Sequence, residues 1–136
     1  MGNRSKIAYS DAEWRRRLTP DQYAICRQKG TEKPFSSHYV DNKAQGYYHC
    51  IACGERLFSS SAKYDSGSGW PSFYEAGNKD AVQEKEDVGQ GMRRTEILCA
   101  RCDSHLGHVF EDGPAPTGLR YCVNALSLEF KSEDNS

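Results

Sequence analysis

The 136-residue sequence has no long apolar run and no excess of either charge. A helix that crosses a membrane needs about 20 consecutive apolar residues, and no segment approaches that length. The 18 basic residues nearly balance the 19 acidic ones, whereas a dedicated nucleic-acid surface requires a basic patch. The one basic run, at 15–17, is typical of a solvated helix face. We therefore expect neither a membrane protein nor a nucleic-acid partner.

Targeting signals are also absent from the first ten residues. They lack the apolar segment of a signal peptide. Lys6 stands where the myristoylation pattern requires serine or threonine. We expect a cytoplasmic protein, in a compartment where thiols stay reduced and Cys-x-x-Cys pairs indicate metal or redox sites rather than structural disulfides.

The length predicts a single domain, 1–136, whose core needs no disulfides. Two helix start signals, a capping box at 10–13 and a second at 19–22 with proline in the first turn, predict short helices within about 10–30. The first helix should end near Leu18 and the second at Gly30. From 34 to 131, short aromatic and aliphatic segments alternate with Gly, Asn, Asp and Pro, which indicates antiparallel strands. The predicted fold class is therefore mainly β, with N-terminal helices.

The predicted strands are 37–40, 46–50, 56–59, 92–98, 108–110 and 119–130. The polar stretch 78–91 is expected to be a loop, and 133–136 a frayed tail. In the last strand the apolar positions change phase after Ala125, which predicts a bulge or a change of neighbour there.

Four of the six cysteines form two Cys-x-x-Cys pairs, Cys50 with Cys53 and Cys99 with Cys102. Two such pairs supply the four thiolates of a tetrahedral zinc site, and each is followed by glycine or aspartate, which tolerate a positive φ. The pairs are too far apart for a compact zinc ribbon, so the metal would join distant parts of the domain. A four-thiolate site is closed and should stabilise rather than catalyse. A redox-active pair and free buried thiols are the alternatives.

Cys122 is left for other chemistry. On a strand it would share one face with Arg120 and Asn124, a cation that favours the thiolate and an amide that can bind a polar substrate. The alternative is a buried core cysteine. Cys26 falls near the C-terminal end of a predicted helix, where the helix dipole does not favour a thiolate, so it is not an obvious nucleophile.

Two more features are candidates for a role in the chemistry. His105 and His108 can supply a general acid near neutral pH, or they serve only as supporting or surface residues. The loop 67–73 holds Trp70 between glycines and a proline. Trp70 either walls a pocket for a small apolar group or packs in the core.

Together these motifs resemble the methionine sulfoxide reductase B family over about 14–130. They are the two Cys-x-x-Cys pairs, Gly-Trp-Pro-Ser-Phe at 69–73, His-Leu-Gly-His-Val-Phe at 105–110 and Arg-Tyr-Cys-Val-Asn at 120–124. Their order and spacing all agree with the family. The resemblance implies two antiparallel sheets with N-terminal helices, a structural Zn²⁺ held by the four paired cysteines, and thiol-dependent reduction of the R epimer of methionine sulfoxide, free or in oxidised proteins and peptides.

The same resemblance implies a role for each remaining site residue. Cys122 attacks the sulfoxide sulfur and becomes a sulfenic acid. The sulfoxide is surrounded by His105, His108 and Asn124, with one histidine as the acid. Trp70 holds the methyl group of the substrate, and Arg120 supports the thiolate.

One position departs from the family pattern. Many members carry a resolving cysteine in the Gly-x-Gly-Trp-Pro loop, where this chain has Ser68. Three consequences are open: Cys26 resolves the sulfenic acid as a Cys26–Cys122 disulfide that thioredoxin reduces, an external thiol reduces it directly, or Ser68 is an engineered replacement. We favour the first. Since a disulfide needs Cα atoms within about 7 Å, we expect the N-terminal region to shift during the cycle.

Two other functions compete with this interpretation. One is a zinc-dependent module that binds a partner through the cysteine turns, and the other is a thiol–disulfide oxidoreductase acting through Cys-x-x-Cys itself. Neither explains why the tryptophan loop, the histidine pair and Cys122 occur together. Nothing in the sequence suggests an obligate assembly, so a monomer is expected. Two questions stay open: whether free or protein-bound substrate is preferred, and which histidine acts as the general acid.

Overall fold

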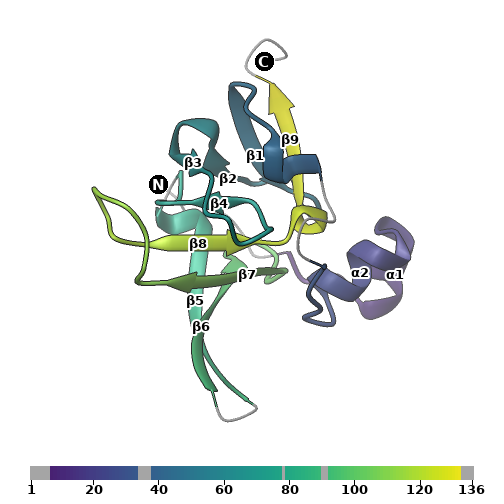
Figure 1. Cartoon of the computed structure of the whole chain (residues 1–136). Helices are drawn as coiled ribbons and strands as arrows, with labels where there is room; N and C mark the ends of the chain where they lie inside the picture. Colours follow the sequence, from purple (N-terminus) through teal and green to yellow (C-terminus); the bar gives the residue numbers. More distant parts are fainter. Residues whose placement is uncertain (1–6, 34–37, 78, 90–91, 133–136) are drawn as a thin grey trace.

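The computed structural model describes residues 7–33, 38–77, 79–89 and 92–132, which form two antiparallel sheets and two short helices (Figure 1). The first sheet has the order β2–β1–β9, from β1 (Gly46–Cys50), β2 (Arg56–Ser59) and β9 (Leu128–Ser132). The second has the order β3–β4–β8–β7–β6–β5, from β3 (Lys63–Tyr64), β4 (Ser72–Phe73), β5 (Val82–Gly89), β6 (Met92–Cys99), β7 (His105–Phe110) and β8 (Arg120–Val123). The predicted fold class is confirmed.

Both N-terminal helices begin where their capping residues predict. In α1 (Asp11–Arg17), the Ser10 hydroxyl accepts a hydrogen bond from the backbone of the first turn. In α2 (Pro20–Cys26), Thr19 and Gln22 each accept a hydrogen bond from the other's backbone N–H, the complete capping box. Among the described residues, no helix combines the length and apolar character needed to cross a membrane.

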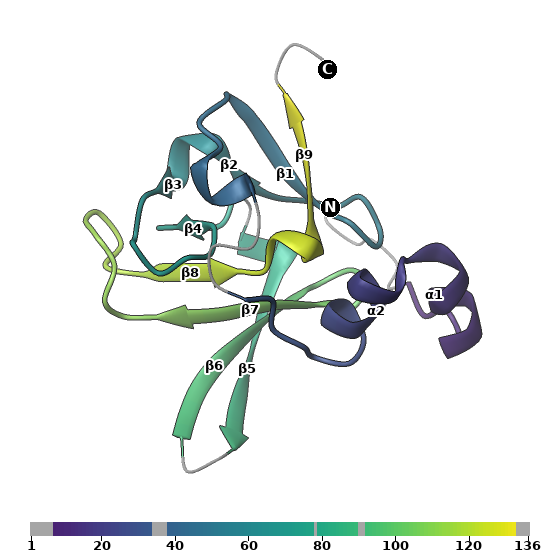
Figure 2. The ribbon, with the colours of Figure 1, turned by 45° about the vertical axis from the view of Figure 1, so that its right-hand side comes forward.

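Helix α2 ends earlier than predicted, at Cys26 rather than near Gly30. Lys29 then takes a positive φ of 59°, and the chain passes so close to the helix that a Cβ on Gly30 would lie 2.9 Å from the Ala24 carbonyl oxygen. This tight return packs α2 against β7 and the 3₁₀ helix η4 (Ala125–Ser127). The N-terminal segment is thereby held against the second sheet (Figure 2).

Two sequence predictions were wrong. Residues 38–40 of the strand predicted at 37–40 belong to the 3₁₀ helix η1 (His38–Asp41), while residue 37 lies outside the described range. The loop predicted at 78–91 contains β5, which pairs with β6 along its full length. This strand is polar because it lies at the sheet edge, in a hairpin that projects from the body (Figures 1 and 2). The tail predicted at 133–136 lies outside the described residues.

The strands predicted at 46–50 and 56–59 are confirmed as β1 and β2, and those at 92–98 and 108–110 extend to the bounds of β6 and β7. The run 119–130 does change neighbour, as its phase shift predicts. It forms β8 in the second sheet, turns through η4, and continues as β9 in the first sheet. One continuous segment therefore joins the two sheets.

Aromatic side chains from both sheets form the centre of the core. Tyr48 and Phe58 belong to the first sheet, and Phe73 and Tyr121 belong to the second. The rings of Phe58 and Phe73 stack with centroids 4.4 Å apart, and Tyr48 meets Phe73 edge-on at 5.1 Å. Because these rings are almost fully buried, they fix the separation of the sheets and hold β4 and β8 in place.

Candidate active site and metal centre

The position of β8 inside the second sheet decides what surrounds Cys122. In the antiparallel register, Cys122 lies opposite Ser72 on β4 and opposite His108 on β7. Directly opposed residues project to the same face of a sheet. The pairing therefore brings the serine-rich and tryptophan-bearing loop before β4, and the histidine strand β7, to the Cys122 sulfur.

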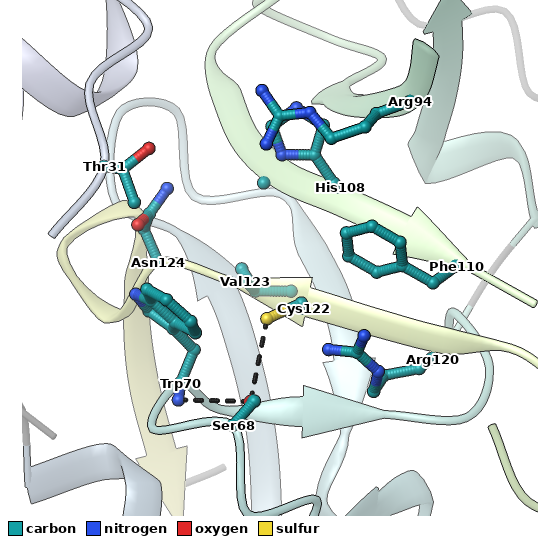
Figure 3. A pocket seen from close by; sticks show the side chains of 11 residues that line it. Thr31, Ser68, Trp70, Arg94, His108, Phe110, Arg120, Cys122, Val123 and Asn124 are labelled. Carbon is teal, nitrogen blue, oxygen red and sulfur yellow. Dashed lines mark hydrogen bonds between the residues drawn. The ribbon is translucent and has the colours of Figure 1, made fainter. Parts of the chain in front are cut away.

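A pocket of about 320 Å³ opens at this place (Figure 3). Its walls are Thr31, Ser68, Trp70, Arg94, Gly107, His108, Phe110, Arg120, Cys122, Val123 and Asn124. Five of the seven non-metal site residues predicted from the sequence thus meet around one cavity. The other two, His105 and Cys26, do not line the pocket: His105 is buried next to His108, and Cys26 is buried at the end of α2.

The Cys122 thiol is half-buried at the base of this pocket. Its Sγ lies 3.8 Å from the Ser68 hydroxyl. Burial raises the pKa of Cys122, while the Ser68 hydrogen bond and the Arg120 guanidinium act in the opposite direction. Arg120 is itself fixed by two hydrogen bonds to the Asp112 carboxylate, at 2.9 and 3.1 Å. The local cation is therefore the main charge available to favour the thiolate.

A β-bulge explains how two histidines three positions apart face the same side. His105 pairs with Leu98, and Gly107 pairs with the preceding residue of β6, so Leu106 is the extra residue. The His105 and His108 rings consequently lie with centroids 5.6 Å apart. His105 is buried, which lowers its pKa despite a 2.7 Å contact from Nδ1 to the Glu96 carboxylate.

Charged residues that the sequence did not mark surround the histidine pair. The His108 Nε2 atom lies 2.9 Å from the Asp87 carboxylate, and Lys29 contacts both Asp87 at 3.0 Å and Glu96 at 3.3 Å. Arg94 approaches Asp87 at 3.3 Å. Hydrogen bonds from His108 and Lys29 lower the pKa of Asp87 to about 2. His108 therefore faces a carboxylate that stays ionised at neutral pH.

Trp70 and Asn124 are held by one backbone segment. The Trp70 indole N–H donates to the Glu32 carbonyl oxygen at 2.9 Å. The Glu32 backbone N–H donates to the Asn124 side-chain oxygen at 3.1 Å, and the Asn124 amide nitrogen donates to the Leu106 carbonyl at 3.2 Å. These partners fix the orientation of the amide, and within the described part of the chain its second N–H has no partner, so it can donate to a bound molecule.

Cys26 lies away from this cavity. It ends α2 with 2% of its surface exposed, and its Sγ is 4.0 Å from the Ser127 hydroxyl. Burial raises its pKa to about 11, and Cys102 and Ser104 are among the neighbours that influence it. In this conformation Cys26 is therefore near the paired cysteines and is a much weaker nucleophile than an exposed thiol.

The four paired cysteines converge, with their sulfur atoms within 4.8 Å of one another. Cys50 and Cys102 approach at 3.7 Å, and Cys53 and Cys99 at 3.6 Å. A tetrahedral ion with metal–sulfur bonds of about 2.3 Å requires sulfur atoms about 3.8 Å apart, so the cluster fits such an ion. Because β1 ends at Cys50 and β6 at Cys99, an ion held at this site would tie the first sheet to the second.

The two cysteine turns share one backbone design. The carbonyls of Cys50 and Cys99 each accept a hydrogen bond from the N–H four residues later, at 2.8 Å. That later residue is Gly54 in one turn and Asp103 in the other, with positive φ values of 84° and 63°. The glycine or aspartate after each pair is thus explained by the backbone conformation that presents both thiols to one point.

The chain is similar in sequence to a known domain family and to named proteins from several organisms. The SelR domain matches residues 18–132. A peptide methionine sulfoxide reductase MsrB from Thiobacillus denitrificans is 62% identical over 92% of this chain and 95% of its own length. Proteins of the same name from Methanosarcina barkeri and Cellvibrio japonicus are 58% and 57% identical, each over 94% of this chain and over 90% and 91% of their own lengths.

The charge next to Cys122 leads to a first prediction. Replacing Arg120 with alanine removes the cation that opposes the effect of burial, so the pKa of Cys122 rises further. Iodoacetamide should then alkylate Cys122 about three- to tenfold more slowly at pH 7.5, with the rate profile displaced to higher pH. Arg93→Ala, which removes an exposed arginine on β6, is the matched control. An unchanged or faster rate for Arg120→Ala would contradict the assignment.

Proposed function

Because the chain belongs to the SelR family of peptide methionine sulfoxide reductases, we propose that it reduces the R epimer of methionine sulfoxide through the thiol of Cys122. The enzyme is an oxidoreductase, and its family acts on methionine sulfoxide. The observation that carries the residue assignment is the pocket in which Cys122 meets Trp70, His108 and Asn124. We propose free and protein-bound methionine sulfoxide as its substrates.

The proposed chemistry is a two-electron exchange between sulfur atoms. The Cys122 thiolate attacks the sulfoxide sulfur while a proton reaches the sulfoxide oxygen. The oxygen then bonds to the Cys122 sulfur while its bond to the substrate sulfur and the new sulfur–sulfur bond both break, so that methionine leaves and Cys122 becomes a sulfenic acid. The sulfoxide sulfur gains the two electrons that the cysteine sulfur loses, so one thiol and one sulfoxide give one sulfenic acid and one thioether.

The pocket offers a partner for each part of this substrate. The Trp70 ring is an apolar surface for the methyl group, and the free N–H of Asn124 is a donor for the sulfoxide oxygen. We propose His108 as the acid because it lines the pocket, with buried His105 supporting it from behind. Arg120 favours the attacking thiolate. Neither competing function, the zinc-dependent binding module or the Cys-x-x-Cys redox enzyme, uses this cavity.

Steady-state turnover tests the proposal directly. With dithiothreitol as reductant, the protein should form methionine from the R epimer and not from the S epimer. Cys122→Ser should reduce the rate more than about 1000-fold, since the nucleophile is lost. Cys26→Ser should keep this dithiothreitol-dependent activity, because a small thiol can reach the sulfenic acid itself. Equal activity of Cys122→Ser and the wild-type protein would contradict the assignment of Cys122 as the nucleophile.

We further propose that Cys26 resolves the sulfenic acid as a disulfide with Cys122, with release of water, and that thioredoxin reduces this disulfide. Cys26 is buried against Ser127, so the step requires the α2 segment to move. Nothing in the described conformation brings the two sulfur atoms together, and direct reduction by an external thiol stays the alternative.

Thioredoxin-dependent turnover distinguishes these two routes. If Cys26 is the resolving thiol, Cys26→Ser should lose most activity with thioredoxin while keeping it with dithiothreitol. Adding Ser68→Cys to that variant should restore thioredoxin-dependent turnover, because the side chain at position 68 already lies 3.8 Å from the Cys122 sulfur. Full activity of Cys26→Ser with thioredoxin would instead support direct reduction.

We also propose that the four-cysteine cluster holds one structural Zn²⁺, through Cys50, Cys53, Cys99 and Cys102. An all-thiolate set of these dimensions suits zinc and has no open position for a substrate. The ion would supply stability rather than chemistry, by holding the ends of β1 and β6 together.

Metal content and thermal stability test this site. Cys102→Ser should lose about one equivalent of zinc per chain and melt at least about 10 °C lower, because structural zinc contributes strongly to folding. Cys26→Ser, a buried cysteine outside the cluster, should retain the metal. Wild-type protein purified without zinc, with all four paired thiols open to alkylation and an unchanged melting temperature, would contradict the proposal.

The remaining expectations stay predictions. They are a cytoplasmic location, a monomeric state, and one catalytic domain over 1–136 with N-terminal helices at about 10–30 and a zinc-containing β part at 34–131. The match of the SelR domain to 18–132 is compatible with a single unit. The absence of a nucleic-acid partner likewise rests on the charge balance alone.

A further inference from the structure

Glu32 is a buried acidic residue that lies outside every motif of the sequence. It has 7% of its surface exposed, and it sits between Thr31, which lines the pocket, and the exposed Lys33. An ionised carboxylate is costly to bury unless hydrogen bonds replace its water. Its position beside the pocket therefore calls for a physical explanation.

The Glu32 carboxylate is anchored to the backbone just after β8, the strand that carries Cys122. One oxygen accepts the backbone N–H of Ala125 at 2.9 Å, and the other accepts that of Leu126 at 3.0 Å. Burial raises the pKa of Glu32, and these two hydrogen bonds act against that rise. The carboxylate thereby joins two segments more than 90 residues apart in the chain.

The backbone of Glu32 is hydrogen-bonded to two side chains that line the pocket, those of Trp70 and Asn124. Its carbonyl oxygen accepts the Trp70 indole N–H, and its N–H donates to the Asn124 amide oxygen. The carboxylate fixes the segment, and the segment fixes the indole and the amide. Figure 3 shows Trp70 and Asn124 side by side near Thr31, across the cavity from His108.

We propose that Glu32 is a positioning residue for sulfoxide reduction: its carboxylate anchors the 31–33 segment so that its backbone holds Trp70 and Asn124 in place against the Cys122 pocket. This inference rests on the proposed function, since it assigns a consequence for the same reaction. Glu32 itself does not line the pocket, so it acts through the two side chains and not on the substrate.

The chemistry of the anchor favours glutamate over its closest substitutes. Two acceptor oxygens match two adjacent N–H groups. A glutamine at this place keeps one acceptor and turns an N–H₂ group toward the second N–H, while alanine removes both contacts. The expected order of activity is therefore wild type, then Glu32→Gln, then Glu32→Ala.

The kinetic test compares these variants with dithiothreitol and R-methionine sulfoxide. A displacement of about 1 Å at a reacting centre can cost about 100-fold in rate, so Glu32→Ala should lower kcat/KM about 10- to 100-fold and Glu32→Gln about 3- to 10-fold. Glu129→Ala, which removes an exposed glutamate on β9 in the other sheet, is the matched control and should behave as wild type.

Alkylation of Cys122 separates positioning from general disruption. Iodoacetamide needs the thiol but neither Trp70 nor Asn124, so its rate with Glu32→Ala should stay within about threefold of wild type. It should not become slower, since the negative charge of Glu32 is one of the groups that raise the pKa of Cys122. Zinc content should also be unchanged. A parallel loss of alkylation and turnover would instead mean a merely structural role.

Tryptophan fluorescence reports the position of the indole without turnover. In a Trp14→Phe background, Trp70 is the only emitting tryptophan, and the substitution removes no hydrogen bond described for Trp14 Nε1. Glu32→Ala should raise acrylamide quenching of Trp70 about twofold as the ring is released from its carbonyl partner. If Glu32→Ala does not fold, Glu32→Gln carries the same test with smaller changes.

The outcomes distinguish a failure of the proposed reaction from a failure of the role assigned to Glu32. No methionine from the wild-type protein would overturn the proposed function and this inference with it. An active wild-type protein together with an equally active Glu32→Ala variant, and unchanged Trp70 quenching, would overturn the inference alone.

Discussion

The double pairing of β8 is the constraint on which the site depends. This strand hydrogen-bonds to β4 on one side and β7 on the other, and its register places Ser72, Cys122 and His108 in one line across the sheet. Strands β7 and β8 lie so close together at this point that a Cβ on Gly107 would lie 2.0 Å from the Cys122 carbonyl oxygen. Only glycine permits this spacing, so the reactive sulfur and the histidine strand are held at a fixed distance by the backbone itself.

Two other devices support that arrangement from outside the sheet. The cysteine cluster brings the ends of β1 and β6 together, and the proposed zinc ion would fix the first sheet to the second there. The segment after α2 contributes Thr31 to the pocket wall. In the same segment, Glu32 is hydrogen-bonded to the start of η4, and Lys29 contacts the carboxylates that pair with the two histidines. The six cysteines thus lie in three environments. The four paired cysteines face one another, Cys122 faces a cavity beside the Arg120 cation, and Cys26 is buried in the core.

Local signals in the sequence predicted what depends on local geometry. Both helix starts, the cysteine turns and the phase change after Ala125 are confirmed, because each is decided by residues within a few positions of one another. Strand β5 was missed because its polar sequence is stabilised by pairing with β6 rather than by burial. Glu32 and Asp87 were missed because their partners lie more than 90 and 20 residues away, and no spacing rule connects them.

The proposed reaction depends on Cys122 being the sulfur that attacks the sulfoxide and is oxidised first. The most direct test is a single turnover without reductant, followed by mass spectrometry of all six cysteines. After R-methionine sulfoxide, we expect one equivalent of methionine, with Cys122 oxidised either to a sulfenic acid trapped by dimedone or to a disulfide, and the four paired thiols unchanged. Methionine formed with Cys122 still a free thiol, or with the oxidation on the paired cysteines, would contradict it.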